Sequence, residues 1–88
     1  MSDKVKIEIK VNGLDLVFEP NVIAFNKFIN EMSTDNKVAP ASNFLRRIVH
    51  PDSKDALDKI LALPGGAVKL AGKVNEIYSP ELEFEVKN

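Results

Sequence analysis

Residues 4–19 read KVKIEIKVNGLDLVFE, and their pattern is the strongest structural signal in the chain. Apolar residues alternate with charged ones up to Val11, which is the period of a strand with one buried face. Asn12-Gly13 comes next, and this dipeptide favours a type I′ turn because both central positions of that turn need a positive φ. The alternation then resumes as far as Phe18. The stretch therefore predicts an antiparallel hairpin.

Helices are predicted for the middle of the chain. Asn21 can cap the first helix by accepting a hydrogen bond from a free backbone N–H. Residues 33–40, STDNKVAP, are polar and turn-rich and are expected to form a loop. A short helix then starts near Ser42 and ends near His50, because the residue before a proline is disfavoured in the helical region. The inward faces are expected to consist of Val22, Phe25, Phe28, Ile29 and Met32 in the first helix and Phe44, Leu45, Ile48 and Val49 in the second.

Two more helices follow. The third is predicted to run from Pro51, which is tolerated in a first helical turn, to about Leu63. A proline–glycine–glycine turn at residues 64–66 breaks it, and a fourth helix is predicted for residues 67–78. Their inward residues are expected to be Ala56, Leu57, Ile60 and Leu61 in the third helix and Leu70, Ala71, Val74, Ile77 and Tyr78 in the fourth.

Residues 81–87 alternate again and predict a third strand with Leu82, Phe84 and Val86 on its apolar face. The first strand exposes mostly lysines, whereas the solvent faces of the other two strands are mostly acidic. Opposite charges on neighbouring strands are favourable by roughly 0.2–1 kcal/mol a pair. The predicted sheet therefore has three strands in the order 2-1-3, with the helices on its apolar face. The fold class is α+β, and residues 1–88 are expected to form a single domain.

The totals exclude several classes of protein. Twelve basic residues face thirteen acidic ones, so the net charge is −1 and the basic surplus of a nucleic-acid binder is missing. The chain has no cysteine, which excludes disulfides and thiolate nucleophiles. No apolar run approaches the roughly 18 residues of a membrane-spanning helix, and the first residues lack the apolar segment of a signal peptide. We therefore expect no nucleic-acid partner and no membrane partner.

The residues show no arrangement that is typical of catalysis. His50 is the only histidine, and it is expected at a helix end, where its charged form would complement the dipole. Asp52, Asp55 and Asp58 lie near the start of a helix, without the glycine and distal glutamate of a calcium-binding loop. We expect no enzyme, no metal site and no cofactor, because nucleophilic and acid–base catalysis both need paired groups.

Binding to another protein is the remaining class of function. Val38, Ala39 and Pro40 are apolar residues in a predicted loop, and Arg46 and Arg47 project from the polar side of the helix that follows. Clustered exposed apolar residues mark binding patches, and arginine can form bidentate pairs with a partner's carboxylate. We expect these five residues to form a protein-binding surface with the arginines at its rim. The alternatives are that Val38 and Phe44 fill the core and that the arginines are only solvated.

Three stretches resemble segments of one protein family. Residues 36–45, NKVAPASNFL, are similar to a family segment NKVAPA-x-NFL. Residues 25–30, FNKFIN, resemble an aromatic-Asn-x-aromatic-Ile-Asn pattern. Residues 63–86 are similar to the family's proline–glycine turn, helix, Tyr-x-Pro and closing strand. The hairpin also fits, so the chain resembles the small tail assembly chaperones of tailed bacteriophages and prophages over nearly its whole length.

The resemblance implies a non-enzymatic chaperone that works in the host cytoplasm. Its expected partner is the tape measure protein, which such chaperones are thought to coat until tail-tube subunits assemble around it. The tail tube protein is a further candidate partner, and a homo-oligomer is compatible with this function. Two other functions stay open: a structural tail subunit that is retained in the virion, and a small regulator that binds a host protein.

Overall fold

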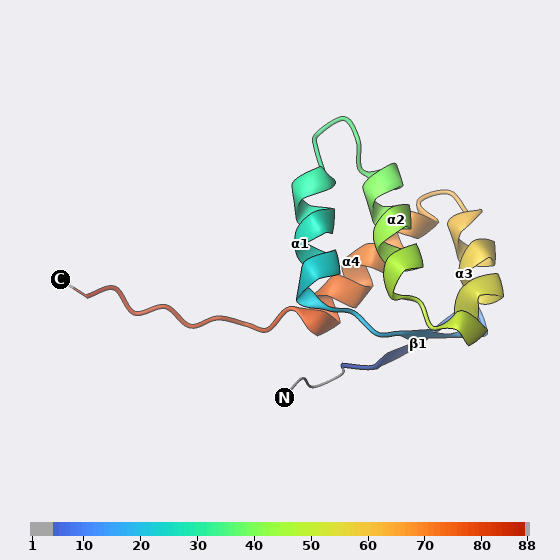
Figure 1. Cartoon of the computed structure of the whole chain (residues 1–88), viewed down its shortest axis with the longest axis horizontal. Coiled ribbons are helices and arrows are strands. Elements are labelled where there is room, and N and C mark those ends of the chain that lie inside the picture. Colours follow the sequence, from blue (N-terminus) through green and yellow to red (C-terminus); the bar gives the residue numbers. More distant parts are fainter. Residues whose placement is uncertain (1–4, 88) are drawn as a thin grey trace.

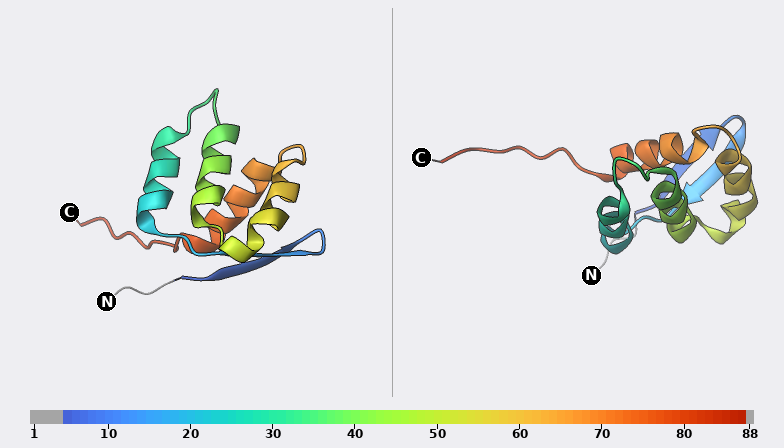
Figure 2. Two further views of the ribbon diagram at one scale, coloured as in Figure 1. Left: turned by 45° about the vertical axis from the view of Figure 1, so that its right-hand side comes forward. Right: turned by 90° about the horizontal axis from the view of Figure 1, so that it is seen from above.

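The computed structural model describes residues 5–87 and places a two-stranded hairpin against a group of helices (Figure 1). The fold is α+β, as predicted, and the helices all lie on one side of the hairpin (Figure 2). The elements in chain order are β1 (Ile7–Val11), β2 (Leu14–Phe18), α1 (Val22–Glu31), α2 (Val38–Ile48), a 3₁₀ turn η1 (Pro51–Ser53), α3 (Lys54–Leu61) and α4 (Gly66–Tyr78).

The hairpin prediction is confirmed. β1 and β2 are antiparallel, with Val11 opposite Leu14 next to the turn and Ile7 opposite Phe18 at the far end. Asn12 and Gly13 have φ values of 50° and 81°. Positive φ at both positions is what a type I′ turn requires, and this turn matches the right-handed twist of the strands.

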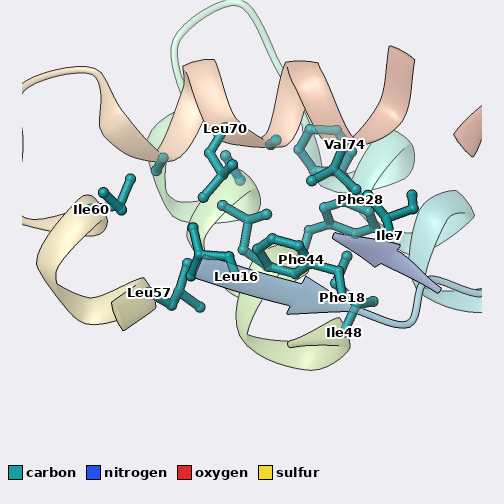
Figure 3. Close-up of a cluster of buried hydrophobic side chains, with 14 of the residues drawn as sticks. Ile7, Leu16, Phe18, Phe28, Phe44, Ile48, Leu57, Ile60, Leu70 and Val74 are labelled. Atoms are coloured by element: carbon teal, nitrogen blue, oxygen red, sulfur yellow. The ribbon is translucent and has the colours of Figure 1, made fainter. Parts of the chain in front are cut away.

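The core lies between the hairpin and the helices. The hairpin contributes one face, with Leu16 and Phe18 fully buried. Phe44 of α2 stacks on Phe28 of α1, with ring centroids 4.9 Å apart, and Val74 of α4 is also fully buried. Side chains from both strands and all four helices form a single cluster (Figure 3). Each fully buried aliphatic or aromatic side chain contributes about 1.5–3 kcal/mol relative to its exposed state, so this cluster holds the hairpin against the helices.

The outer edge of β2 is closed by the connection between α2 and η1. Val17 donates its N–H to Ser53 Oγ at 3.0 Å, and its carbonyl accepts from the His50 N–H at 2.8 Å. The Glu19 N–H also donates to the Ile48 carbonyl at 2.8 Å. Backbone groups at a sheet edge otherwise offer a template for another strand. This edge of the hairpin is therefore occupied by the chain itself.

Replacing Ser53 with alanine should destabilise the protein. Ser53 is buried, and its hydroxyl is the partner of the Val17 N–H, so the variant leaves that N–H without an acceptor. A buried donor that loses its partner costs about 1–3 kcal/mol. Urea denaturation followed by circular dichroism measures this loss as a lower midpoint. Ser33→Ala, at an exposed loop position, is the matched control and should change the free energy of unfolding by less than about 0.5 kcal/mol. Equal midpoints for the two variants would contradict the assigned role of Ser53.

The prediction of a third strand and of the order 2-1-3 is wrong for residues 5–87, in which the sheet consists of β1 and β2 alone. After α4 ends, residues 79–87 run away from the domain without helix or strand hydrogen bonds (Figure 1). The alternation of Leu82, Phe84 and Val86 specifies a chain that can act as a strand, but it does not specify a partner. The charge argument for the order was too weak to decide it, because each exposed pair is worth about 1 kcal/mol or less.

Two helix boundaries also differ from the prediction. α2 begins at Val38, so the segment Val38–Pro40 forms its first turn and is not part of a loop. Pro40 is tolerated there because the first N–H groups of a helix have no partner within the helix. The predicted third helix is divided into η1 and α3, with Pro51 in the first turn of η1 as expected. α1, capped by Asn21, and α4 lie within one residue of the predicted ranges.

Candidate partner-binding surface

α1 presents an apolar face to solvent. Five of its residues were predicted to face inward, but only Phe28 among them is fully buried, and the small Ala24 is buried beside it. Val22, Ile29 and Met32 are 62%, 46% and 40% exposed. α1 therefore packs through the Ala24–Phe28 side, and the predicted inward face is rotated toward solvent.

The three exposed residues and the half-buried Phe25 form a continuous line. Val22, Phe25, Ile29 and Met32, called the α1 stripe below, are three, four and three residues apart. Side chains at these spacings lie on the same face of a helix. Scattered exposed apolar residues are ordinary, but a contiguous apolar patch marks an interaction site. The α1 stripe is such a patch.

The α1 stripe continues onto the end of α4. The Phe25 and Tyr78 rings lie 5.9 Å apart at their centroids, in a tilted arrangement. A shallow pocket of about 360 Å³ adjoins them, and none of its lining residues is charged. These lining residues are Val22, Phe25, Asn26, Tyr78, Ser79 and Pro80. An apolar, uncharged hollow of this kind can accept an apolar side chain from a partner.

The surface predicted from the sequence is only partly assembled. Val38 is 63% exposed and Ala39 is exposed, but Pro40 is buried and cannot contribute to a surface. Arg46 and Arg47 lie in the last turn of α2, about 12 Å along the helix from its first turn at 1.5 Å per residue. The five residues therefore share a helix, but they do not form one compact patch.

Both arginines are already paired within the chain. Arg46 Nη1 lies 2.8 Å from Asp58 Oδ1, and Arg47 Nη1 lies 3.6 Å from Glu31 Oε1. Exposed pairs of this kind contribute about 0–1 kcal/mol to stability. A partner's carboxylate would have to compete with these pairs. The arginines are thus weaker candidates for partner contacts than Val38 and Ala39.

Val38 and the α1 stripe approach the same end of the molecule. Met32 follows the last turn of α1 and Val38 opens α2, and the short loop between them is closed by two hydrogen bonds between the backbones of Ser33 and Asn36. The α1 stripe is what the sequence analysis missed. The sequence did contain a signal for it: the apolar residues of α1 cover more of the helix circumference than one packed face can bury.

His50 follows the C-cap of α2, Val49, and therefore lies at a helix end as predicted. It is also the N-cap of η1, and its Nδ1 accepts a hydrogen bond from the Asp52 N–H at 3.1 Å. This hydrogen bond fixes the side chain at the junction of α2 and η1. Among residues 5–87, no three His, Asp or Glu side chains gather as metal ligands would.

No helix in the described part of the chain has the length and apolar character needed to cross a bilayer.

Comparison with known proteins places the chain among phage proteins. A family model described as phage tail assembly chaperone matches residues 7–88, from β1 through the segment that follows α4. An uncharacterised 11.3 kDa protein from the lys 3′ region of Haemophilus phage HP1 is 36% identical over 85 residues. That match covers 97% of this chain and 83% of the HP1 protein. No solved structure matches the chain.

Proposed function

Because the chain belongs to the phage tail assembly chaperone family, we propose that it binds the tape measure protein during tail assembly, in the host cytoplasm and without catalysing a reaction. The observation that supports a binding function is the α1 stripe, an apolar helix face on which Val22, Ile29 and Met32 are between 40% and 62% exposed. The family description points to partners among tail proteins, and we take the tape measure protein as the partner because chaperones of this kind are thought to coat it. The tail tube protein is the further candidate.

The binding mode that we propose is a helix laid along the α1 stripe. An amphipathic helix presents apolar anchors at spacings of three and four residues, which is the spacing of the α1 stripe itself. The pocket beside Phe25 and Tyr78 would take one anchor, and Val38 and Ala39 would extend the contact at the other end. Polar residues adjoin the α1 stripe, since helical spacing places the exposed Asn26 and Asn30 beside Val22 and Ile29. An apolar centre with a polar rim is the usual anatomy of a protein–protein interface.

The test is the substitution Ile29→Glu, with Ile23→Glu as its matched control. Ile29 belongs to the α1 stripe, whereas Ile23 is 81% exposed on another side of the same helix. A buried interface anchor contributes about 2 kcal/mol or more, so Ile29→Glu should weaken binding to a purified tape measure fragment by about 30-fold or more. Ile23→Glu should change the Kd by less than about threefold. Isothermal titration calorimetry gives the Kd, and far-UV circular dichroism checks that both variants stay folded.

Equal affinity of the two variants would remove the α1 stripe as the binding surface. Absence of binding by the unsubstituted chain would remove the tape measure protein as the partner. Recovery of the chain in purified infectious particles would favour a structural tail subunit instead, because a chaperone leaves before the tail is complete.

A further inference from the structure

β1 has one edge that nothing in the described part of the chain covers. In this hairpin Glu8 lies directly opposite Val17. Val17 directs its N–H and C=O away from β1, toward Ser53 and His50. In an antiparallel ladder, the backbone N–H and C=O groups of two directly opposed residues either both point toward the partner strand or both point away from it. Glu8 and, two residues on, Lys10 therefore direct their backbone groups away from β2. This edge is an open template for one more strand.

Residues 81–87, called the tail below, have the character of an unpaired strand. Leu82, Phe84 and Val86 are between 68% and 86% exposed, although they are among the most apolar residues of the chain. No backbone hydrogen bond joins the tail to the rest of residues 5–87. The chain is extended here, so each residue advances about 3.3 Å, and the tail reaches roughly 20 Å beyond Pro80. That length is enough to pair with the whole of a five-residue strand such as β1.

A cleft beside β1 complements the tail. It has a volume of about 450 Å³ and lies between β1 and the α3–α4 corner. Its apolar walls include Ile9, Val11, Leu63 and Leu70, and its charged lining residues are all lysines, namely Lys10, Lys69 and Lys73. The tail alternates three apolar residues with Glu81, Glu83 and Glu85. The apolar side chains of such a strand match the apolar walls of the cleft, and the lysines around it favour an acidic segment over a basic one.

We propose that the tail of one copy of this chain adds as a strand to the free edge of β1 in a second copy. In that arrangement Leu82, Phe84 and Val86 continue the helix-facing side of the sheet and enter the cleft. The glutamates then lie on the opposite side, where β1 presents Glu8 and Lys10 and where Lys6 directly precedes the strand. Backbone hydrogen bonds supply affinity in this type of strand addition, and the pockets for alternate side chains supply specificity.

The direction of the tail favours a second copy over the same chain. Tyr78 holds the end of α4 against Phe25, and from there the tail points away from the domain (Figure 2). Pairing with its own β1 would require the chain to reverse at Ser79–Pro80, whereas a neighbouring copy can meet the tail as it stands. Each copy then offers one donor strand and one acceptor edge.

The experiment compares self-association of the full chain with that of two single variants. Phe84→Glu replaces the central apolar residue of the tail with a charged one. It does not disturb the core, because Phe84 is not part of the buried cluster. Glu8→Pro removes an outward N–H from the free edge without removing a β1–β2 hydrogen bond. Sedimentation velocity over a concentration series should show association of the unsubstituted chain, and each variant should raise the self-dissociation constant at least about tenfold. Ile23→Glu, at an exposed apolar residue elsewhere, should leave that constant unchanged.

Mixing the two variants provides the sharper readout. Phe84→Glu keeps its acceptor edge and Glu8→Pro keeps its tail, so an equimolar mixture should associate although neither variant does so alone. The proposal is overturned if the unsubstituted chain stays monomeric, if Phe84→Glu associates normally, or if the mixture fails to associate while both variants are folded. A monomer with a protected Glu8 amide in hydrogen exchange would mean that the tail pairs with its own chain. Binding to the tape measure fragment is measured separately with Phe84→Glu, so failure of the two proposals can be told apart.

Discussion

Replacing Phe44 with alanine is expected to lower the free energy of unfolding by about 3–5 kcal/mol. The Phe44 side chain is fully buried at the centre of the core, where it stacks on Phe28. Truncation removes its burial energy and also leaves a cavity that the surrounding helices can fill only in part. A domain of this size has a total stability of roughly 4–13 kcal/mol, so the variant should lose a large fraction of its stability. Thermal denaturation followed by circular dichroism measures the loss.

The chain supplies a matched control for this substitution. Phe84 is the same residue type at 84% exposure, so Phe84→Ala should change the stability of the monomer by less than about 0.5 kcal/mol. The comparison is made at low protein concentration, where self-association does not contribute. A small loss for Phe44→Ala, similar to that for Phe84→Ala, would show that the core is not organised around Phe44.

Gly66→Ala should give the second large loss of stability. Gly66 opens α4, and a Cβ built on it would overlap the backbone carbonyl oxygen of Ile60 in α3. A backbone atom cannot move aside as a flexible side chain can, so α3 and α4 would have to separate. Overpacking of this kind costs about 1–3 kcal/mol and occasionally more. The midpoint of urea denaturation measures the effect.

Gly72 provides the contrast within the same helix. A Cβ at Gly72 would meet nothing within 4 Å, and alanine is favoured over glycine inside a helix by about 0.5–1 kcal/mol. Gly72→Ala should therefore stabilise the protein while Gly66→Ala destabilises it. Destabilisation by both substitutions to the same extent would show that the close contact between α3 and α4 is not what distinguishes Gly66.

Local signals were sufficient to predict the elements. The Asn12-Gly13 turn determined the hairpin because few other conformations satisfy that dipeptide, and the breaks at Pro51 and at residues 64–66 separated the last three helices. The start of α2 at Val38 was missed because the predicted loop was continued from the polar residues 33–37 as far as Pro40. A proline is accepted in the first turn of a helix, so Pro40 did not mark the end of the loop.

The partner of each surface could not be predicted in the same way. Alternation in the tail describes one strand, and pairing depends on which backbone edge the rest of the fold leaves open. The face of α1 was also decided by tertiary packing, because Ala24 allows a closer approach to the core than Val22 or Ile29 does. Of the five residues predicted to bind a partner, Val38 and Ala39 are exposed, whereas Pro40 is buried and the two arginines are paired. Sequence patterns indicate which secondary structure a segment can form and which of its faces is apolar. The packing of the core determines which of those faces is buried and which strand edge is paired.

The single cluster of buried side chains has a consequence for the order in which the chain can fold during synthesis. Leu16 and Phe18 leave the ribosome early, but they share their cluster with Leu70 and Val74, which are made more than fifty residues later. Contacts between distant parts of a chain form only after the intervening loop has closed, and that closure is slow. The apolar face of the nascent hairpin is therefore completely covered only after translation has passed α4. Fragments that stop short of α4 should offer that face to any chaperone or nascent chain nearby.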